Sequence, residues 1–438
     1  MGPQNKAFFP KIEQEPLKNI SIYEDMRLRE ALQYLSSNSP FYRDLFKNNN
    51  VAIENIKSVA GLLEIPVTTK LDLQQRNDDF LCVPREKIID YITTSGTLGD
   101  PVTFALTAKD LDRLAYNEAI SFACAGGTSA DVYQLMTTMD RRFMAGLAYF
   151  LGIRMLGAGV VRVGNGIPEL QWDTIRRIKP NTIIAVPSFI LKIIEHAEQH
   201  GIDYRSSSVK SAVCIGEPLR ENDLSFNTLG RKITEKWDIK LFSTYASTEM
   251  ATSFTECPEG TGGHHHPELI IVEFLDDHNN PVGPGEPGEV TVTTLGVEAM
   301  PLLRFKTGDV CYHFNTPCAC GRQTTRLGPI IGRKNQMIKY KGTTLFPSAL
   351  YDILDNIGYI SNYIVEVYTN EIGTDEILLH LSGKGIGEEK ENDIKDHFRA
   401  RLRVAPLIKF APESTIQKML FPELSRKPVK FIDNRKKD

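Results

Sequence analysis

Apolar and polar residues alternate along the chain in blocks that suit strands and helices in turn. Residues 182–186, 211–215 and 239–242 are short apolar runs with the length of buried strands. After the first run, residues 189–197 repeat their apolar side chains at helical spacing. Because strand patterns alternate with helical patterns over about residues 88–250, we expect an α/β fold in which helices cover a parallel or mixed sheet.

The pattern changes twice toward the C-terminus. Residues 268–312 have short strand-like stretches broken by glycine and proline, which predicts a β-rich subdomain. After Gly332, short strand and helix patterns and a polar helix over about 387–403 predict a small α+β domain. We therefore expect a domain over residues 1–332, with its β-rich subdomain at about 260–330, and a second domain over 333–438.

The composition is typical of a globular protein. Of 438 residues, 41% are hydrophobic and 24% are charged, and the net charge of −4 comes from interspersed residues of both signs. No basic surface for nucleic acid is expected from this balance. No stretch approaches the roughly 20 apolar residues of a membrane helix, and the first residues have no apolar signal core. We expect a cytoplasmic protein that binds neither nucleic acid nor membrane.

The cysteines predict metal binding rather than disulfides. Seven of them are scattered along a large chain, and an odd, scattered set does not suit a disulfide framework. Cys257, the histidines at 264–266, and Cys318 and Cys320 supply sulfur and imidazole ligands that suit zinc. Three thiolates and one imidazole would leave no open position, so the site would be structural. Free thiols beside a solvated histidine run are the alternative, because Cys-x-Cys spacing is tighter than usual.

A hydroxyl- and glycine-rich segment carries the strongest sign of chemistry. In residues 91–101, Thr93, Thr94 and Ser95 lead into Gly96-Thr97 and then Gly99. Such a turn presents hydroxyls and backbone N–H groups to one point, which suits a polyphosphate. It lacks the Gly-Lys-Ser/Thr ending of a P-loop, so a kinase or an ordinary ATPase is not expected. Taken alone, a polar surface loop is an equal alternative.

Later motifs favour the phosphate interpretation. Thr244-Tyr-Ala-Ser-Thr-Glu249 is expected in a loop that follows the strand ending at Phe242. The further motifs, in chain order, are Leu303-Arg-Phe-Lys-Thr-Gly-Asp309, Gly332-Arg-Lys-Asn-Gln-Met337 and Arg426-Lys-Pro-Val-Lys430. Shorter matches are Ser39-Pro-Phe-Tyr-Arg43, Thr68-Thr-Lys-Leu-Asp72, Val83-Pro-Arg-Glu-Lys-Ile88, Phe346-Pro-Ser348 and Asp433-Asn-Arg435. Over nearly the whole chain, this ordered set resembles the phenylacetate–coenzyme A ligase family of the adenylate-forming (acyl-CoA synthetase) superfamily.

The resemblance implies a fold and a reaction. The fold is a large α/β N-terminal adenylating domain of several subdomains with a small, mobile α+β C-terminal domain. The reaction is the ATP-dependent activation of an organic, phenylacetate-like aromatic acid to an acyl adenylate and then to a coenzyme A thioester, with release of AMP and pyrophosphate. A homodimer is expected by analogy. Transfer of the acyl group to a carrier protein, or an inactive nucleotide-binding relative, are the alternatives.

The resemblance also assigns the nucleotide contacts. Tyr245 would lay its ring against the adenine, and Asp309 would accept the ribose hydroxyls. Arg333 matches the arginine before the superfamily hinge, and Arg304 and Arg326 are candidates for phosphate contact unless they are plain surface arginines. The triphosphate would lie on Thr94, Ser95, Gly96, Thr97 and Gly99, and the adenine would be edged by Gly216-Glu217-Pro218 and by Ala246 and Ser247 beside Tyr245.

The catalytic residues follow from the charge that develops at the α-phosphorus. Glu249 is the expected Mg²⁺ ligand, because a hard cation takes carboxylate and phosphate oxygens. Thr248 could hydrogen-bond the α-phosphate. Lys427 matches the family's C-terminal lysine, whose ammonium would bridge the attacking carboxylate and the α-phosphate; Lys430 is the competing choice.

Three positions depart from the family pattern. Asp100 stands where the family usually has lysine, Ala246 where many relatives have glycine, and Asn335 where the hinge usually has aspartate or lysine. Asparagine tolerates a positive φ, so Asn335 could still take up the rotation that gates the two half-reactions. These three departures are the features that favour the alternative interpretation, an inactive nucleotide-binding relative.

The acid and metal sites complete the expectations. The acyl pocket is expected near residues 136–150, residues 186–189 and Thr244, with Phe143, Phe150 and Phe189 as apolar surface. The motifs do not separate phenylacetate from another aryl or small acid. Relatives carry a Cys, His, Cys-x-Cys set, and alignment with them favours His264 as the fourth zinc ligand beside Cys257, Cys318 and Cys320.

Overall fold

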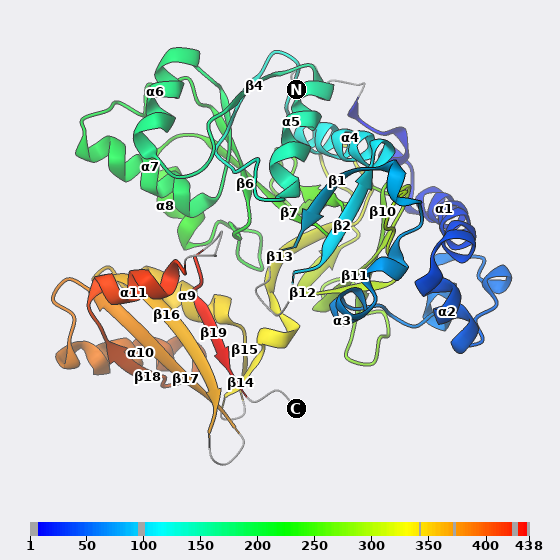
Figure 1. The fold of residues 1–438 in the computed structure, drawn as a ribbon. Helices are drawn as coiled ribbons and strands as arrows, with labels where there is room; N and C mark the ends of the chain where they lie inside the picture. The colour runs from blue at the N-terminus through cyan, green and yellow to red at the C-terminus, as the bar shows by residue number, and fades with distance from the viewer. Residues whose placement is uncertain (1–7, 95–100, 341–342, 371–373, 423–427, 436–438) are drawn as a thin grey trace. The chain divides into compact units, whose positions relative to one another are not determined.

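The computed structural model describes residues 8–94, 101–340, 343–370, 374–422 and 428–435 (Figure 1). The chain divides into two compact units: Met1–Thr307 with Cys311–Pro329, and Gly308–Val310 with Ile330–Asp438. The expected domain boundary between residues 332 and 333 stays a prediction. Among the described residues, no helix has both the length and the apolar character needed to span a membrane.

A six-stranded sheet forms the centre of the first unit. Its strand order is β4-β3-β5-β6-β7-β8, in which β8 alone runs antiparallel to its neighbour. The strands are β3 (Val132–Leu135), β4 (Gly159–Arg162), β5 (Thr182–Ala185), β6 (Ser211–Ile215), β7 (Lys240–Ser247) and β8 (Thr252–Thr255). The predicted apolar strands are confirmed as β5, β6 and the first half of β7.

Helices cover both faces of this sheet, which is why its strands are apolar on successive residues. On one face, Phe122 and Ile153 from two helices pack on Leu135, Val213 and their neighbours. On the other face, Trp172, Ile190 and Ile233 from three helices pack on the opposite side of the strands. The first pair of helices is α4 (Ala108–Cys124) and α5 (Met144–Leu156), and the other three are α6 (Pro168–Ile178), α7 (Pro187–Gln199) and α8 (Thr228–Lys236).

The predicted β-rich subdomain is a five-stranded sheet of order β10-β11-β12-β13-β9. Its strands are β9 (Gly263–His264), β10 (Ile270–Leu275), β11 (Gly288–Thr294), β12 (Phe305–Phe314) and β13 (Arg326–Arg333). A separate hairpin pairs β1 (Ile88–Thr93) with β2 (Thr103–Thr107). The N-terminal region contains α1 (Leu17–Asn38), α2 (Pro40–Asn48), α3 (Lys70–Gln75) and the 3-10 turns η2 (Lys11–Gln14), η3 (Ile53–Asn55), η4 (Val59–Glu64), η5 (Asn77–Phe80) and η6 (Arg85–Lys87).

The second unit has the α+β character that the sequence predicts. Its four-stranded sheet has the order β18-β17-β16-β19, and a hairpin pairs β14 with β15. The elements are η7 (Lys334–Gln336), β14 (Ile338–Tyr340), β15 (Thr343–Leu345), α9 (Pro347–Asn356), β16 (Ile360–Thr369), β17 (Asp375–Gly383), η8 (Glu388–Lys390), α10 (Glu391–Leu402), β18 (Leu407–Phe410), α11 (Glu413–Leu420) and β19 (Phe431–Asn434). The helix expected over about 387–403 is shorter, because a 3-10 turn precedes α10.

Candidate active site and metal centre

Two of the predicted adenine-contact segments lie side by side at the carboxyl edge of the six-stranded sheet. Strand β6 ends at Ile215, which pairs with Thr244 of the parallel strand β7. The turn that begins at Gly216 therefore leaves the sheet next to Tyr245. Gly216 has φ +75°, a backbone conformation that glycine adopts without strain. Ligands of open α/β sheets bind outside the carboxyl ends of the strands, which is where these segments meet.

The structure corrects the expected loop at residues 244–249. Strand β7 continues to Ser247, because residues 244–247 pair with β8 in an antiparallel hairpin. The hydroxyls of Thr244 and Thr255 are 2.6 Å apart across this pair, so polar residues extend the strand beyond its apolar run. Thr248 and Glu249 lie in the hairpin turn, where Ser247 Oγ accepts a hydrogen bond of 3.3 Å from the backbone N–H of Met250.

The side chain of Glu217 holds a helix rather than facing the turn. Its carboxylate oxygens accept hydrogen bonds from the backbone N–H of Ser188 (2.8 Å) and from the Ser188 hydroxyl (2.9 Å). Ser188 lies in the first turn of α7, where an anion is favoured by the unpaired N–H groups of the helix. The backbone of Gly216-Glu217-Pro218 thus remains as the part of this turn that could contact a nucleotide.

The predicted phosphate segment is described only at its ends. Thr94 donates its backbone N–H to Val102 O (2.9 Å), and its hydroxyl accepts the N–H of Val102 (3.1 Å). These two bonds join the ends of the segment to the β1–β2 hairpin. Ser95, Gly96, Thr97 and Gly99, as well as Asp100, lie outside the described residues. Their phosphate contacts stay predictions.

Two of the arginines named from sequence are buried, so the surface alternative is wrong for both. Arg304 is 2% exposed and pairs with Glu273 at 2.9 Å, while its Nη1 donates to Ile65 O (2.6 Å). Arg326 is 6% exposed and donates to Thr261 O (2.7 Å) and to the Thr316 hydroxyl (2.7 Å). Arg304 thus joins β10 to the residue after η4, and Arg326 joins the segments at Thr261 and Thr316. Phosphate contact by either arginine stays a prediction.

Asp309 and Arg333, both in the second unit, form an ion pair of 3.0 Å. The Asp309 side chain is 10% exposed and that of Arg333 is 43% exposed. The ion pair fixes the orientation of the carboxylate that is expected to accept the ribose hydroxyls. Ribose binding by Asp309 and phosphate contact by Arg333 stay predictions.

The two lysines that compete for the catalytic role differ in what the structure shows. Lys427 lies outside the described residues. The ammonium of Lys430 donates to the Tyr363 hydroxyl (2.9 Å) and lies 4.7 Å from the centre of the Tyr363 ring. Lys430, which precedes β19, thus contacts Tyr363 of β16, and the choice between the two lysines stays a prediction.

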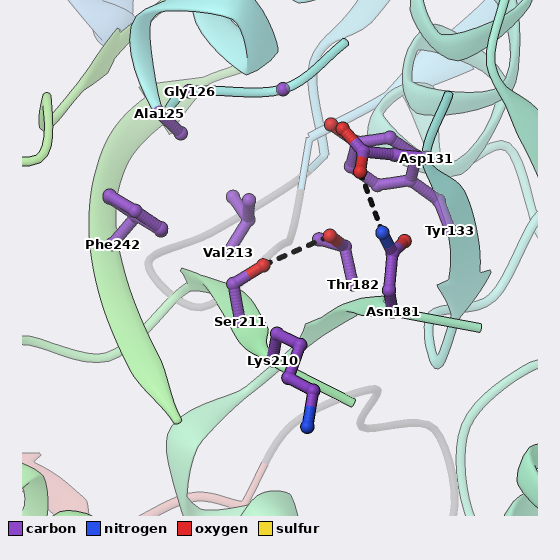
Figure 2. Close-up of a pocket in the computed structure, with 11 residues that line it drawn as sticks. Ala125, Gly126, Asp131, Tyr133, Asn181, Thr182, Lys210, Ser211, Val213 and Phe242 are labelled. Carbon is purple, nitrogen blue, oxygen red and sulfur yellow. Dashed lines mark hydrogen bonds between the residues drawn. The ribbon is translucent and has the colours of Figure 1, made fainter. Parts of the chain in front are cut away.

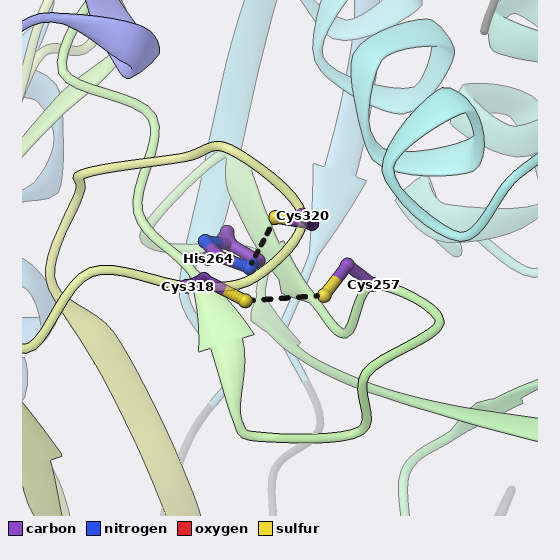
Figure 3. A group of neighbouring side chains, drawn as sticks. All are labelled: Cys257, His264, Cys318 and Cys320. Carbon is purple, nitrogen blue, oxygen red and sulfur yellow. Dashed lines mark hydrogen bonds between the residues drawn. The ribbon is translucent and has the colours of Figure 1, made fainter. Parts of the chain in front are cut away.

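Four predicted metal ligands come together in one cluster (Figure 3). The ligand atoms of Cys257, His264, Cys318 and Cys320 all lie within 4.8 Å of one another. The sulfurs of Cys257 and Cys318 are 3.6 Å apart, and Cys320 Sγ is 3.5 Å from His264 Nε2. Ligands about 2.1–2.3 Å from a tetrahedral zinc are separated by roughly 3.5–3.8 Å, so the side chains fit this ion.

One thiol of the cluster, that of Cys320, is favoured as the thiolate, while the same contact raises the pKa of its partner Cys257. Contact with Cys257 lowers the pKa of the Cys320 thiol far below its usual range, and the neighbouring His264 lowers it further. A thiolate is the form of cysteine that binds zinc. Cys124 lies beside the cluster, but burial raises the pKa of its thiol to about 12 and it is not among the converging ligands.

Two buried ion-pair systems lie around this cluster, and neither was predicted from the sequence. Glu13 is fully buried between Arg322 (2.7 Å) and His266 (2.5 Å), and Arg322 Nη1 lies 3.6 Å from Cys320 Sγ. Arg220 pairs with Glu256 through two bonds of 2.5 and 3.0 Å. The partners in each system are far apart in the chain, so no local pattern could have indicated them.

A buried carboxyl group in α4 is linked by hydrogen bonds to strand β8 of the β7–β8 hairpin. Glu118 in α4 accepts a hydrogen bond from Asn117 Nδ2 (2.9 Å), and Asn117 Oδ1 accepts the backbone N–H of Ser253 (3.1 Å). Ser253 pairs with Ala246 across the hairpin. Burial raises the pKa of Glu118 to about 8, although its hydrogen bonds act in the opposite direction. Burial therefore favours the protonated, neutral form of this side chain.

A cavity of about 110 Å³ lies at the opposite edge of the same sheet (Figure 2). It is lined by residues at the amino ends of the strands, including Thr182 and Ser211, whose hydroxyls are 2.9 Å apart. On another side of the cavity, Asn181 Nδ2 donates a hydrogen bond to Asp131 Oδ1 (2.6 Å). Because it lies away from the carboxyl ends of the strands, this cavity is not the predicted nucleotide site.

Comparison with known proteins places the chain among the AMP-binding enzymes, whose family model matches residues 44–299. A solved structure of 2-hydroxyisobutyryl-CoA ligase has the same fold, with a TM-score of 0.83 and 22% identity over 99% of this chain and 94% of that one.

Two curated relatives define the family more closely. The phenylacetate–coenzyme A ligase of Thermus thermophilus is 29% identical over 94% of this chain and 95% of its own length. The phenylacetate–coenzyme A ligase of Aromatoleum evansii is 30% identical over 78% of this chain and 77% of its own length. The chain therefore belongs to the phenylacetate–coenzyme A ligase family, and it is an adenylate-forming acid–thiol ligase.

Replacing Glu118 by glutamine should change how stability depends on pH. The folded pKa of about 8 is above the unfolded value of about 4.3. The contribution of Glu118 to stability is therefore full below about pH 4 and is lost as the pH rises through 8. Between pH 5.5 and 8, the wild type should lose about 1–3 kcal/mol more unfolding free energy than Glu118→Gln in urea titrations. Asp112→Asn, an exposed change in the same helix, is the matched control; equal pH slopes for Glu118→Gln and wild type would contradict the assignment.

Proposed function

We propose that the protein converts a phenylacetate-like aromatic acid, ATP and coenzyme A into the acyl-CoA thioester, AMP and pyrophosphate. The observation that carries the proposal is the nearly full-length match to a phenylacetate–coenzyme A ligase. The juxtaposition of Gly216 and Tyr245 at the carboxyl edge of the sheet supports the nucleotide half of the proposal. The aromatic character of the acid rests on the names of the relatives.

In the proposed complex, ATP is held by the residues that the resemblance assigns to it. The ring of Tyr245 lies against the adenine, and the backbone of Gly216-Glu217-Pro218 meets the adenine edge, with Ala246 and Ser247 beside it. Asp309, oriented by Arg333, accepts the ribose hydroxyls. The triphosphate lies on the hydroxyls and N–H groups of Thr94, Ser95, Gly96, Thr97 and Gly99, with Arg326 as a further phosphate contact.

The first chemical step joins the acid to AMP. A carboxylate oxygen attacks the α-phosphorus, a new O–P bond forms, and the bond from the α-phosphorus to the pyrophosphate oxygen breaks. The Lys427 ammonium and the Thr248 hydroxyl stabilise the charge on the α-phosphate. Glu249 would hold Mg²⁺, which neutralises the phosphate oxygens.

The second step transfers the acyl group. The thiolate sulfur of coenzyme A attacks the acyl carbonyl, and the bond to AMP breaks, so that AMP leaves with the electron pair. In the proposal, the backbone rotates at Asn335 between the two steps, which gates the two half-reactions.

Zinc is proposed for the cluster of Cys257, His264, Cys318 and Cys320. With four protein ligands it would have no open position, so it would hold the loops together rather than act on the substrate. The distances and the lowered thiol pKa described above support this assignment.

Incubation with ATP, coenzyme A and a panel of acids tests the reaction. Phenylacetate should give AMP and a thioester, with a kcat/KM at least about tenfold above that of acetate, because an aromatic pocket gains binding free energy from the ring. Chromatography of nucleotides and thioesters is the measurement. Accumulation of ADP would refute the mechanism, and thioester formation only on a carrier protein would refute the acceptor.

Lys427→Ala should separate the two half-reactions. Loss of the ammonium should slow acid-dependent pyrophosphate exchange by about 10²–10³-fold, while transfer from a prepared acyl adenylate to coenzyme A stays within a few-fold of wild type. Lys430→Met is the matched control and should keep pyrophosphate exchange within about tenfold, because Lys430 is engaged with Tyr363. Equal loss of both half-reactions in Lys427→Ala would argue against its role.

Elemental analysis of protein purified without a histidine tag tests the metal. We expect about one equivalent of zinc in the wild type and a loss of most of it in Cys318→Ser, because a serine oxygen is a poor replacement for a thiolate ligand. Cys124→Ala removes the neighbouring thiol that is not a ligand and should retain the metal. Less than about half an equivalent in the wild type would count against zinc.

A further inference from the structure

The metal cluster lies at the end of β8, the antiparallel partner of the strand β7 that carries Tyr245. Cys257 is the second residue after β8, and His264 lies in β9, which bridges to Glu256 through Gly263. Strand β8 is in turn the antiparallel partner of β7, which carries Tyr245. Two sets of side-chain contacts connect the cluster to the nucleotide segments.

The first connection is a stack of three rings. Tyr245 and Phe254 face each other across the β7–β8 pair, with ring centres 6.0 Å apart and planes 24° from parallel. The other neighbour of Phe254 is His265, at 6.3 Å and 21°. His265 follows the metal ligand His264 in the chain. Phe254 is 1% exposed and His265 is 3% exposed, so neither ring can move without displacing packed atoms.

The backbone beneath this stack is also close-packed. A Cβ on Gly263 would lie 2.5 Å from the carbonyl oxygen of Phe254 and 3.0 Å from its Cβ. Only glycine therefore lets the residue before His264 approach β8 this closely. A shift of the His264 segment would thus be transmitted to Phe254 through backbone contact as well as through the His265 ring.

The second connection is a buried ion pair to the other adenine segment. Arg220 follows the Gly216–Pro218 turn by two residues, and Glu256 precedes Cys257. Their bidentate pair has bonds of 2.5 and 3.0 Å, and the side chains are 11% and 3% exposed. Glu256 Oε2 also accepts the backbone N–H of Ser243 in β7 (3.1 Å). A buried bidentate pair fixes position strongly, because breaking it leaves a charge without a partner.

We propose that the metal cluster sets the affinity for the nucleotide, acting through the Phe254–His265 stack on Tyr245 and through the Arg220–Glu256 pair on the Gly216–Pro218 turn. The inference rests on the proposed function, which gives these two segments the adenine. Without the metal, three close thiols no longer hold the 257–264 and 318–320 loops in one arrangement, and Phe254 loses its fixed neighbour. Phe254 and His265 are positioning residues, since neither would touch the nucleotide.

Variants that keep the metal test the first connection. Phe254→Leu keeps the volume of the side chain roughly but removes the ring, and it should weaken AMP binding about three- to tenfold in calorimetry. Phe80→Leu is the matched control: Phe80 is also fully buried and stacks on Phe41 at 4.0 Å, but it lies in the N-terminal region. Phe80→Leu should bind AMP like wild type. An equal effect of both variants, or no effect of Phe254→Leu with zinc retained, overturns the proposal.

The ion pair and the metal itself give two further readouts. Arg220→Lys keeps the charge but loses the bidentate geometry, and it should weaken AMP binding by at least about threefold with zinc still bound. Chelation of zinc from the wild type should weaken AMP binding by at least about tenfold while circular dichroism shows a folded protein. Unchanged AMP affinity after chelation overturns the proposal, and so does wild-type protein that holds no zinc.

Failure of this inference can be told apart from failure of the proposed function. AMP binding requires no acid, so the result does not depend on which acid is the substrate. Tyr245→Ala tests the adenine contact directly: if it leaves AMP affinity unchanged, the proposed adenine site is wrong. If Tyr245→Ala weakens AMP binding but Phe254→Leu and Arg220→Lys do not, the adenine site stands and the connection to the metal is refuted.

Discussion

The register between β6 and β7 is the constraint on which the nucleotide half of the structure depends. Because Ile215 is paired with Thr244, the Gly216 turn leaves the sheet beside Tyr245. A slip of one residue would turn Tyr245 to the other face of the sheet and separate it from this turn. Strand β8 pairs with β7 on the side away from β6. Glu118 contacts Ser253 of β8, and the metal ligand Cys257 follows β8 by two residues.

The secondary structure was predictable where both faces of a strand are covered. The runs that became β5 and β6 are apolar at successive positions, because helices pack on each side of them, and a continuous apolar run is visible in the sequence. The end of β7 was not predictable in this way. Its residues 244–247 are mostly polar, and they form a strand only because β8, eleven residues away at Thr255, offers matching hydroxyl and backbone partners.

In the candidate site, too, features that depend on residue type could be predicted, and features that depend on distant contacts could not. The metal ligands could be proposed from residue types, and the resemblance selected His264 from a run of three histidines, two of which the structure uses elsewhere: His265 accompanies Phe254 and His266 contacts Glu13. The burial of Arg304 and Arg326 could not be foreseen, because Glu273 in β10 and Thr261, their respective partners, are 31 and 65 residues away in the chain. The raised pKa of Glu118 depends on the packing of α4 against β8, which no local pattern encodes.

The guanidinium group of Arg435 holds the chain just after the predicted hinge. Arg435 donates to the backbone carbonyls of Asn335 (2.8 Å) and Met337 (2.6 Å), and it also pairs with Asp433 and Asp375. Asp375 in turn accepts the backbone N–H of Lys339 (2.7 Å). The stretch from the Asn335 carbonyl to Lys339 is thereby fastened to the ends of β17 and β19. If the backbone rotates at the predicted hinge, the rotation is therefore confined to the few torsion angles between Arg333 and the Asn335 carbonyl.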